Sequence, residues 1–273
     1  MLSDMTFGQY YPTESAVHRM DPRTKLILLI VYIVTVFVAK NFYGLAVSLI
    51  FVLAAILFSR VPLRSVLKSL KGIFFLVIFT FILNVLFYLP QEGDRVLFWR
   101  ISVQGIVSAS FFALRIIFLV LGSSVLTLTT TPVSLTDGLE SLLTPLSWLH
   151  FPVHDLALIM SIALRFIPTL AEETDRIIRA QKARGADFES GNLIRRAKAL
   201  IPVLVPLLIG AFRRANELGD AMDARCYAGS PHRTKYKKLK FSYRDPIAVL
   251  ATGIFLAGVI LCNVYAAYLP VLF

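Results

Sequence analysis

Charged segments separate five long apolar runs along the chain. They are residues 26–39, 42–59, 72–89, 103–128 and 246–269. A membrane-spanning helix needs roughly 17–25 mostly apolar residues, so four of the runs have a spanning length and the first is short for a span. Lys40 and Asn41 separate the first two runs, which predicts a helical hairpin with these two residues at its tip.

A different pattern occupies residues 132–245, which are too polar to span a bilayer and too apolar for a disordered loop. Two long amphipathic stretches lie here, preceded by a shorter predicted helix at 134–143. Apolar residues recur every seven positions, which is typical of helices with one buried face: Leu156, Ala163, Leu170 and Ile177 in the first stretch, and Ala197, Leu204, Ala211 and Leu218 in the second. Pro168, Pro202 and Pro206 are expected to bend or segment these helices.

Composition agrees with a membrane protein. The chain is 57% hydrophobic and 16% charged, with a mean hydropathy of +0.72, whereas soluble domains are about 45–50% apolar and about 25% charged. This excludes an ordinary soluble enzyme. The two cysteines, Cys226 and Cys262, give neither a disulfide framework nor a metal-ligand spacing, and the N-terminal residues do not read as a cleaved signal peptide. We therefore predict an all-α, polytopic membrane protein.

The net charge of +11 is unevenly placed. Lysine and arginine collect before the first run, between the second and third, and within 132–245, while the opposite side receives only Lys40 and a charge-balanced loop at 91–100. Because basic loops stay in the cytoplasm, the N-terminus is expected inside and the C-terminus outside. The predicted domains are 1–131 with four spans, 132–245 as a cytoplasmic region, and 246–273 with the last span.

Both amphipathic stretches end in the same way. Each seven-residue series continues onto an arginine flanked by alanine and a small residue: Ala183-Arg184-Gly185 and Ala224-Arg225-Cys226. A guanidinium offers five donors suited to carboxylates and carbonyls in a protein groove, so these ends are candidate docking points. Alternatively, each arginine only complements the helix dipole at an ordinary helix stop. Periodicity alone does not identify a partner.

Three segments carry a resemblance to a known family that extends over nearly the whole chain. They are HRMDPRTKL at 18–26, ALRFIPTLAEETDRIIRAQKARGAD at 163–187, and VPLLIGAFRRANELGDAMDARCY at 205–227. The sequence resembles the transmembrane T component (EcfT/CbiQ family) of energy-coupling factor (ECF) transporters, which import vitamins and some metal ions across prokaryotic cell membranes.

The resemblance implies a non-catalytic subunit whose long coupling helices dock two cytoplasmic ABC ATPases. It assigns docking to Arg184 and Arg225, with Ala183, Gly185, Ala224 and Cys226 beside them; Cys226 stands where the family usually has glycine. ATP and Mg²⁺ would belong to the ATPases, and this sequence has no G-x-x-x-x-G-K-[ST] phosphate loop. A separate membrane subunit, the S component, would bind the vitamin or metal ion, and one T component can serve several such subunits. No cofactor, metal or catalytic residue is expected in this chain.

Two other classes of protein are alternatives to this assignment. The first is a membrane-embedded, metal-dependent enzyme using His150, His154 and Asp155, although Pro152 argues against one continuous helix there. The second is a self-contained secondary transporter, which the odd number of spans and their nearly uncharged helices disfavour.

Three further polar features have a structural explanation. Arg115 and Asn84 lie within predicted spans and are candidates for contacts between helices. The basic run at 235–240 is assigned to anionic lipid and membrane topology rather than to nucleic acid.

Overall fold

The computed structural model describes residues 10–88, 96–98, 101–149, 151–188, 192–227, 229 and 239–265. The chain forms two compact units. We call the first the bundle unit, which comprises Gly8–Ser141 and Leu239–Phe273, and the second the arm unit, which lies within Leu142–Lys238.

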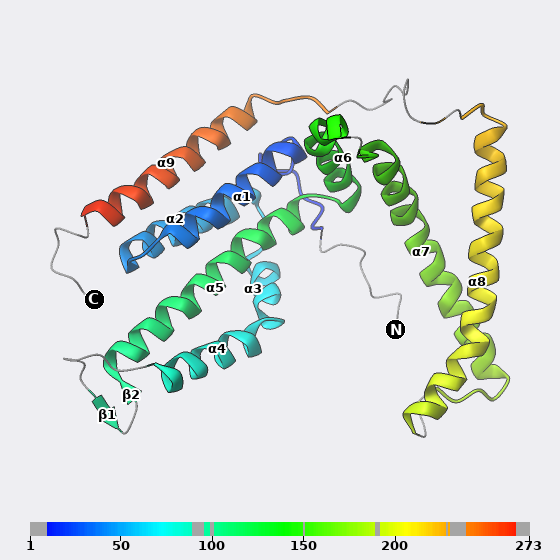
Figure 1. Ribbon diagram of the computed structural model, residues 1–273, viewed down its shortest axis with the longest axis horizontal. Coiled ribbons are helices and arrows are strands. Elements are labelled where there is room, and N and C mark those ends of the chain that lie inside the picture. The colour runs from blue at the N-terminus through cyan, green and yellow to red at the C-terminus, as the bar shows by residue number, and fades with distance from the viewer. Residues whose placement is uncertain are drawn as a thin grey trace. The chain divides into compact units, whose positions relative to one another are not determined.

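Helices make up almost all of the bundle unit. They are α1 (Pro22–Val38), α2 (Phe42–Ser59), α3 (Leu63–Lys71), α4 (Phe74–Phe87), α5 (Val103–Thr129), α6 (Pro132–Leu143) and α9 (Arg244–Tyr265). A small antiparallel hairpin, β1 (Val96–Phe98) and β2 (Ile101–Ser102), precedes α5. Helices α1, α2, α5 and α9 lie side by side, and α4 packs along α5 (Figure 1).

Three predicted spans coincide with single helices, namely α2, α5 and α9, and each is long and apolar enough to cross a membrane. The run at 72–89 instead gives α4 of 14 residues, bent by 57° from α3 at the break after Lys71. Helix α1 has 17 residues. Among the described residues five helices pass the test of length and apolarity, or six if the bent pair counts as one, which confirms the all-α, polytopic class.

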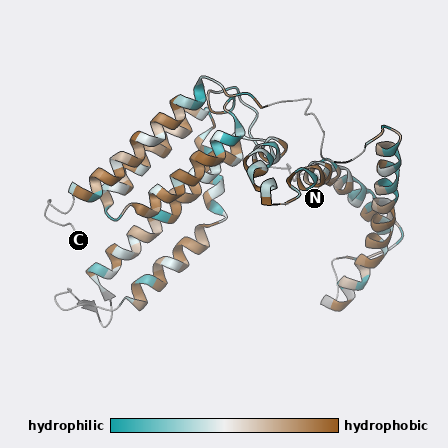
Figure 2. Ribbon diagram, turned by 45° about the horizontal axis from the view of Figure 1, so that its top comes forward, coloured by the Kyte–Doolittle hydropathy of each residue, from teal (hydrophilic) through white to brown (hydrophobic). Residues whose placement is uncertain are grey.

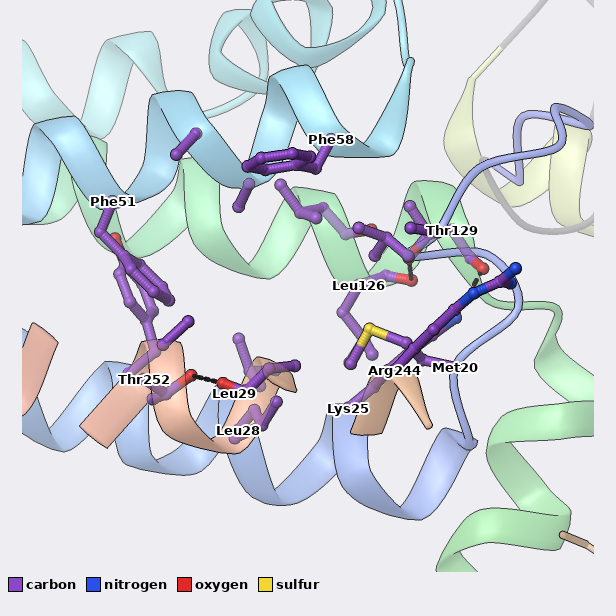
Figure 3. Close-up of a pocket in the computed structure, with 18 of the residues that line it drawn as sticks. Met20, Lys25, Leu28, Leu29, Phe51, Phe58, Leu126, Thr129, Arg244 and Thr252 are labelled. Carbon is purple, nitrogen blue, oxygen red and sulfur yellow. Dashed lines mark hydrogen bonds between the residues drawn. The ribbon is translucent and has the colours of Figure 1, made fainter. Parts of the chain in front are cut away.

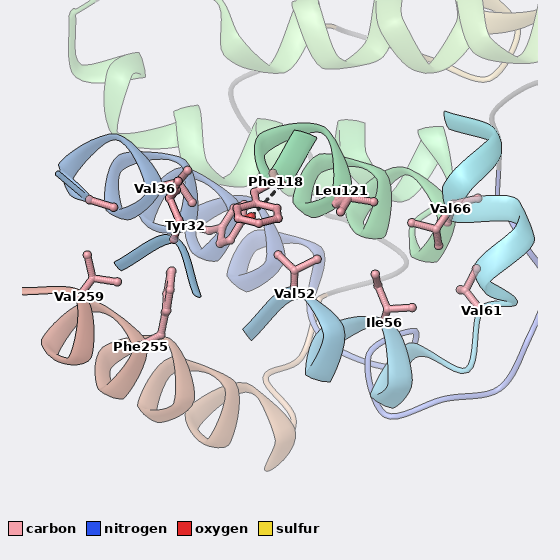
Figure 4. Packing of buried hydrophobic residues seen from close by; sticks show 13 residues of the cluster. Tyr32, Val36, Val52, Ile56, Val61, Val66, Phe118, Leu121, Phe255 and Val259 are labelled. Carbon is pink, nitrogen blue, oxygen red and sulfur yellow. Dashed lines mark hydrogen bonds between the residues drawn. The ribbon is translucent and has the colours of Figure 1, made fainter. Parts of the chain in front are cut away.

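An aromatic cluster forms the centre of the bundle core. The Tyr32 ring stacks against Phe51 at 5.9 Å and Phe255 at 5.8 Å between ring centroids, and its hydroxyl donates to the Phe118 carbonyl at 2.8 Å. Figure 4 shows Tyr32 and Phe255 facing Phe118 and Val52 from different helices. On α5, a Cβ at Gly122 would lie 2.1 Å from the Tyr32 ring. The absence of a side chain there lets α5 approach α1.

Side chains from α5 and α9 hold the turn between α1 and α2. The Lys40 N–H donates to Asn263 Oδ1 at 3.1 Å, and Asn263 Nδ2 donates to the Val38 carbonyl at 2.8 Å. Arg115 Nη2 donates to the Ala39 carbonyl at 2.6 Å, with its guanidinium 4.7 Å from the Phe111 ring centroid. The intramembrane arginine therefore contacts a neighbouring helix end. Asn84, by contrast, donates within α4, to the Thr80 carbonyl at 2.9 Å.

The HRMDPRTKL segment ties three helix ends together. Asp21 Oδ1 caps α1 by accepting the Arg23 N–H at 2.9 Å, and the Asp21 N–H donates to Asp245 Oδ1 at 3.0 Å at the start of α9. Lys25 Nζ donates to the Thr129 carbonyl and to Thr130 Oγ1, each at 3.0 Å, at the end of α5. The motif thus serves the fold of the bundle unit.

Just before α1, hydrogen bonds hold the His18 ring at both of its nitrogens. Its Nε2 donates to the Tyr11 carbonyl at 3.0 Å, and its Nδ1 lies 2.7 Å from the Ser15 hydroxyl. This pattern fits the neutral ring with its proton on Nε2. Burial lowers the pKa of His18 below its ordinary value, because desolvation disfavours the charged imidazolium.

The arm unit contains a short 3₁₀ helix, η1 (Thr144–Leu149), and two helices of 31 residues each, α7 (Val153–Ala183) and α8 (Leu193–Asp223). Pro168 lies inside α7, and Pro202 and Pro206 lie inside α8, so none of the three divides its helix into segments. Hydrophobic and polar residues mix along both, whereas apolar residues dominate the bundle helices (Figure 2). By length and apolarity α7 and part of α8 also pass the test for a span.

Candidate functional site

The end of α7 is closed by backbone hydrogen bonds around the first arginine motif. The Gly185 N–H donates to the Lys182 carbonyl at 3.0 Å, and the Ala186 N–H donates to the Gln181 carbonyl at 3.0 Å. Gly185 has a φ of 87°. These two bonds and the left-handed residue make a Schellman motif, with Ala183 as the last helical residue and Arg184 as the C-cap.

The end of α8 has the same geometry. The Cys226 N–H donates to the Asp223 carbonyl at 2.9 Å, and the Tyr227 N–H donates to the Met222 carbonyl at 3.0 Å. Cys226 takes the left-handed position with a φ of 57°, although an L-residue with a Cβ adopts it at a cost of about 1–2 kcal/mol. Replacing the usual glycine therefore leaves the backbone conformation of the motif unchanged.

Both predicted arginines project from these ends without a partner in the described part of the chain. Arg184 and Arg225 are exposed, and the caps are made by backbone groups alone. Their neighbours Ala183, Gly185, Ala224 and Cys226 are exposed as well, so the residues that directly flank each arginine are small and accessible. Each site thus presents a permanent cation with free donors that a carboxylate or a row of carbonyls could accept.

Helices α7 and α8 run in opposite directions and cross, so their C-terminal ends lie at opposite ends of the pair (Figure 1). Each helix of 31 residues is about 46 Å long at 1.5 Å per residue. The two arginine motifs are therefore separate sites, each able to meet a different partner.

An ion pair that the sequence analysis missed fixes the crossing. Arg214 Nη2 on α8 donates to Glu173 Oε2 on α7, and the two side chains are only 26% and 28% exposed. A Cβ at Gly210 would lie 3.2 Å from Glu173 Oε1, so this glycine makes room for the carboxylate. Glu173 precedes Arg184 by eleven residues, and Arg214 precedes Arg225 by the same number. The spacing does not by itself indicate that Glu173 and Arg214 meet, because they lie on different helices.

The candidate metal site has no support. His154 and Asp155 lie in the first turn of α7, immediately after Pro152 at its N-cap, and His150 lies outside the described residues. Where the structure is described, no group of three or more histidine, cysteine, aspartate or glutamate side chains could hold a metal ion. Most of the loop at 91–100 and of the basic run at 235–240 also lies outside the described ranges.

Comparisons with known proteins place the chain in a family. The family described as "Cobalt transport protein" (CbiQ) matches residues 13–236. A protein of Clostridium kluyveri, named "Energy-coupling factor transporter transmembrane protein EcfT", is 48% identical over 97% of this chain and 99% of its own length. Proteins with the same name from Brevibacillus brevis and Bacillus subtilis are 49% and 46% identical, over 93% and 92% of this chain and 96% and 95% of their own.

These matches confirm the resemblance found in the sequence, and they leave the metal-dependent enzyme without support. With several helices apolar enough to cross a bilayer, the chain is a multi-pass protein of the cell membrane. It belongs to the CbiQ/EcfT family, the transmembrane components of energy-coupling factor transporters.

Proposed function

We propose that this chain is the non-catalytic coupling subunit of its transporter. It links two cytoplasmic ABC ATPases to a separate substrate-binding membrane subunit, the S component, during uptake of a micronutrient, either a vitamin or a metal ion. The observation that carries the proposal is the pair of matched helix ends, each with an exposed arginine that is unpaired within the described residues, at opposite ends of two crossed helices.

Arg184 and Arg225 each dock one ATPase. In each motif the small flanking residues allow the partner surface to come close, and the guanidinium donates to carboxylates or carbonyls in a groove of that surface. ATP and Mg²⁺ bind in the ATPases, because the sequence of this chain has no phosphate-loop motif.

The crossing of α7 and α8 carries movement from one docking site to the other. The Glu173–Arg214 pair is largely shielded from water, so changes at one helix end reach the other through a fixed contact. Exposed apolar side chains on α8 form a surface for the S component; they are Leu200, Ile201, Leu204, Val205 and Leu208.

Residues 132–245 lie on the cytoplasmic side in this proposal, although α7 and part of α8 are long and apolar enough to span. The second half of α7 carries six charged residues, which are costly within hydrocarbon; they are Glu172, Glu173, Asp175, Arg176, Arg179 and Lys182. A cysteine introduced at Ser190, in a chain lacking Cys226 and Cys262, should resist an impermeant thiol reagent in intact cells and react after lysis. Labelling in intact cells would refute this placement.

The decisive experiment compares two double charge reversals of equal size. We expect Arg184→Glu with Arg225→Glu to lower the amount of ATPase that co-purifies with this chain at least tenfold and to abolish substrate uptake. The control is Arg179→Glu with Arg213→Glu, which changes exposed arginines on the same two helices and should leave both measurements near wild type.

The outcomes separate the parts of the proposal. Normal uptake in the Arg184→Glu, Arg225→Glu variant would refute the docking role. ATPases that remain bound while uptake fails would mean that the arginines transmit movement without anchoring. If the wild-type chain purifies from gently solubilised membranes with no ATPase at all, the coupling function itself is wrong.

A further inference from the structure

A cavity of about 480 Å³ lies entirely within the bundle unit, between α1, α2, α5 and α9. Nearly all the side chains that line it are apolar, including Leu28, Leu29, Val125 and Leu126. Such a cavity offers too few polar partners to hold ordered water. Its volume falls in the range of about 300–1,000 Å³ that is typical of small-molecule sites.

The cavity exists because α2 and α9 diverge. They are close near Gly44, where a Cβ would lie 3.7 Å from Val259, and the Phe51 and Phe255 rings stack at 4.4 Å. Beyond this stack, toward the end of α2 and the start of α9, the two helices line the cavity with small residues: Ala54, Ala55, Ala248 and Ala251. Phe58 and Ile247 at its margin are 69% and 63% exposed, so the cavity is open to the surroundings of the bundle.

Polar groups gather at one end of the cavity. Figure 3 shows Lys25, Arg244 and Thr129 together at that end, with Phe51 and Thr252 at the other. Positive charge places this end on the cytoplasmic side of the membrane, at the depth of the lipid headgroups. The long axis of the cavity therefore leads from the headgroup region into the hydrocarbon.

Arg244 is the cation available to a ligand. Lys25 Nζ already donates to the Thr129 carbonyl and to Thr130 Oγ1. The Arg244 guanidinium lies 5.2 Å from the Tyr243 ring centroid, and its Nε donates to the Tyr243 hydroxyl at 3.2 Å, whereas its two terminal nitrogens have no hydrogen bond to a described residue. Asp245 does not neutralise it, because its carboxylate accepts the Asp21 and Ser242 backbone N–H groups.

We propose that the cavity binds one anionic phospholipid, with an acyl chain between α2 and α9 and the phosphate on Arg244. An acyl chain fits the apolar walls, and a guanidinium with two free terminal nitrogens matches a phosphate in geometry and charge. A helix from another protein does not fit. The lining residues of α1 extend only from Lys25 to Tyr32, about 10 Å, and within that length the volume is too narrow for a helix of 10–12 Å diameter.

The test is native mass spectrometry of the full chain, purified and delipidated in mild detergent, then titrated with dioleoyl phosphatidylglycerol or dioleoyl phosphatidylcholine. We expect one tightly bound phosphatidylglycerol and at least tenfold weaker binding of phosphatidylcholine. Ala251→Phe fills the cavity and should weaken the first phosphatidylglycerol at least tenfold. Ala257→Phe is the matched control, because Ala257 is exposed on the same helix and does not line the cavity.

A second variant distinguishes the contribution of the lipid headgroup to binding from that of the acyl chain. Arg244→Gln should reduce phosphatidylglycerol binding to the level of phosphatidylcholine, while Arg64→Gln, an exposed arginine on α3, should preserve the preference. Soluble glycerol phosphate should not displace the lipid. Ala55→Phe fills the cavity from α2 and replaces Ala251→Phe if that variant elutes as an aggregate.

The proposal is overturned by any of three results. They are wild-type affinity in both cavity-filling variants, an unchanged preference for phosphatidylglycerol in Arg244→Gln, and displacement of the lipid by glycerol phosphate alone, which would indicate a site for free phosphate.

Discussion

The two units differ in how many of their hydrophobic side chains are buried within the unit. In the bundle unit, α1, α2, α5 and α9 converge on one core, and the described residues of this unit include thirteen buried hydrophobic side chains in a single cluster. In the described part of the arm unit, the buried hydrophobic residues are Val153, Ala157 and Val203, although α7 and α8 are the longest helices of the chain.

The difference shows where each unit finds its stability. Helices α1, α2 and α9 each pack against two or three other helices of the unit, and α5 packs against four, so their sequences are constrained by close internal contacts. Along α8 the apolar face stays open, with Leu204 61% and Leu208 55% exposed. Large exposed apolar faces of this kind are typical of surfaces that bind a protein partner or a membrane. The described part of the bundle unit therefore has an internal core, whereas the described part of the arm unit buries few apolar side chains within itself.

The largest effect should come from adding a single methyl group in the bundle core. In Gly122→Ala the new Cβ would lie 2.1 Å from the Tyr32 ring, which cannot move freely between Phe51 and Phe255. Overpacking of this kind costs about 1–3 kcal/mol, so thermal unfolding in detergent should begin at a clearly lower temperature. Gly253→Ala on α9, where nothing lies within 4 Å of the added atom, should be close to neutral. Equal stability of the two variants would contradict the close α1–α5 packing.

In the arm unit a single ion pair should matter more than any apolar contact. Glu173→Gln leaves Arg214 without its charged partner at a largely buried crossing. We expect the substitution to lower the free energy of unfolding by an amount between two limits. These are the loss for a surface ion pair, about 0–1 kcal/mol, and that for a buried pair, about 3–5 kcal/mol. Amide hydrogen exchange should accelerate in the middle of both α7 and α8.

The neighbouring surface pair provides the control. Arg213 and Glu217 lie on α8 with side chains 80% and 61% exposed, so Glu217→Gln should leave exchange almost unchanged. Exchanging the charges, Glu173→Arg with Arg214→Glu, should restore part of the protection. If Glu173→Gln and Glu217→Gln behave alike, the crossing is held by apolar contacts, and the contrast between the two units weakens.

A smaller effect, of opposite sign at the two helix ends, should follow from exchanging glycine and non-glycine residues. Cys226 and Gly185 both have positive φ values. Cys226→Gly relieves strain and should slow exchange of the Tyr227 N–H, while Gly185→Ala introduces strain and should accelerate exchange of the Ala186 N–H. Each substitution should change the free energy of the left-handed backbone conformation by about 1 kcal/mol. Because a Cβ at Gly185 would meet nothing within 4 Å, the effect is one of backbone conformation. No change at Cys226 would mean that the end of α8 is not held in this conformation.

Features set by local sequence could be predicted, and those set by contacts between distant segments could not. The uninterrupted apolar runs gave α2, α5 and α9, because spanning length and hydropathy are local properties. The repeated alanine-arginine motif marked both helix ends correctly, since capping depends on adjacent residues. The bend between α3 and α4 was not predicted, because residues 63–71, which form α3, were assigned to the basic link before the run at 72–89.

Long-range polar contacts needed the structure. The ion pair between Glu173 and Arg214 joins residues on different helices, and nothing near either residue in the sequence indicates which partner it meets. Arg115 was recognised as a candidate for contact between helices, but its acceptor, the Ala39 carbonyl, depends on where α1 ends beside α5. The three prolines of α7 and α8 do not divide these helices, because both helices continue past them.

Glu173 precedes Arg184 by the same number of residues as Arg214 precedes Arg225. The two arginines therefore lie at equal distances from the helix crossing. If the helices pivot at the ion pair, the segment of each helix from the pivot to its arginine is eleven residues long, or about 16 Å. When the crossing angle opens by about 10° and both helices rotate equally, each tip moves by about 1.4 Å at this radius. Forces of equal size applied at the two tips would therefore exert matched torques about the crossing, and would rotate the helices with little displacement of the crossing itself.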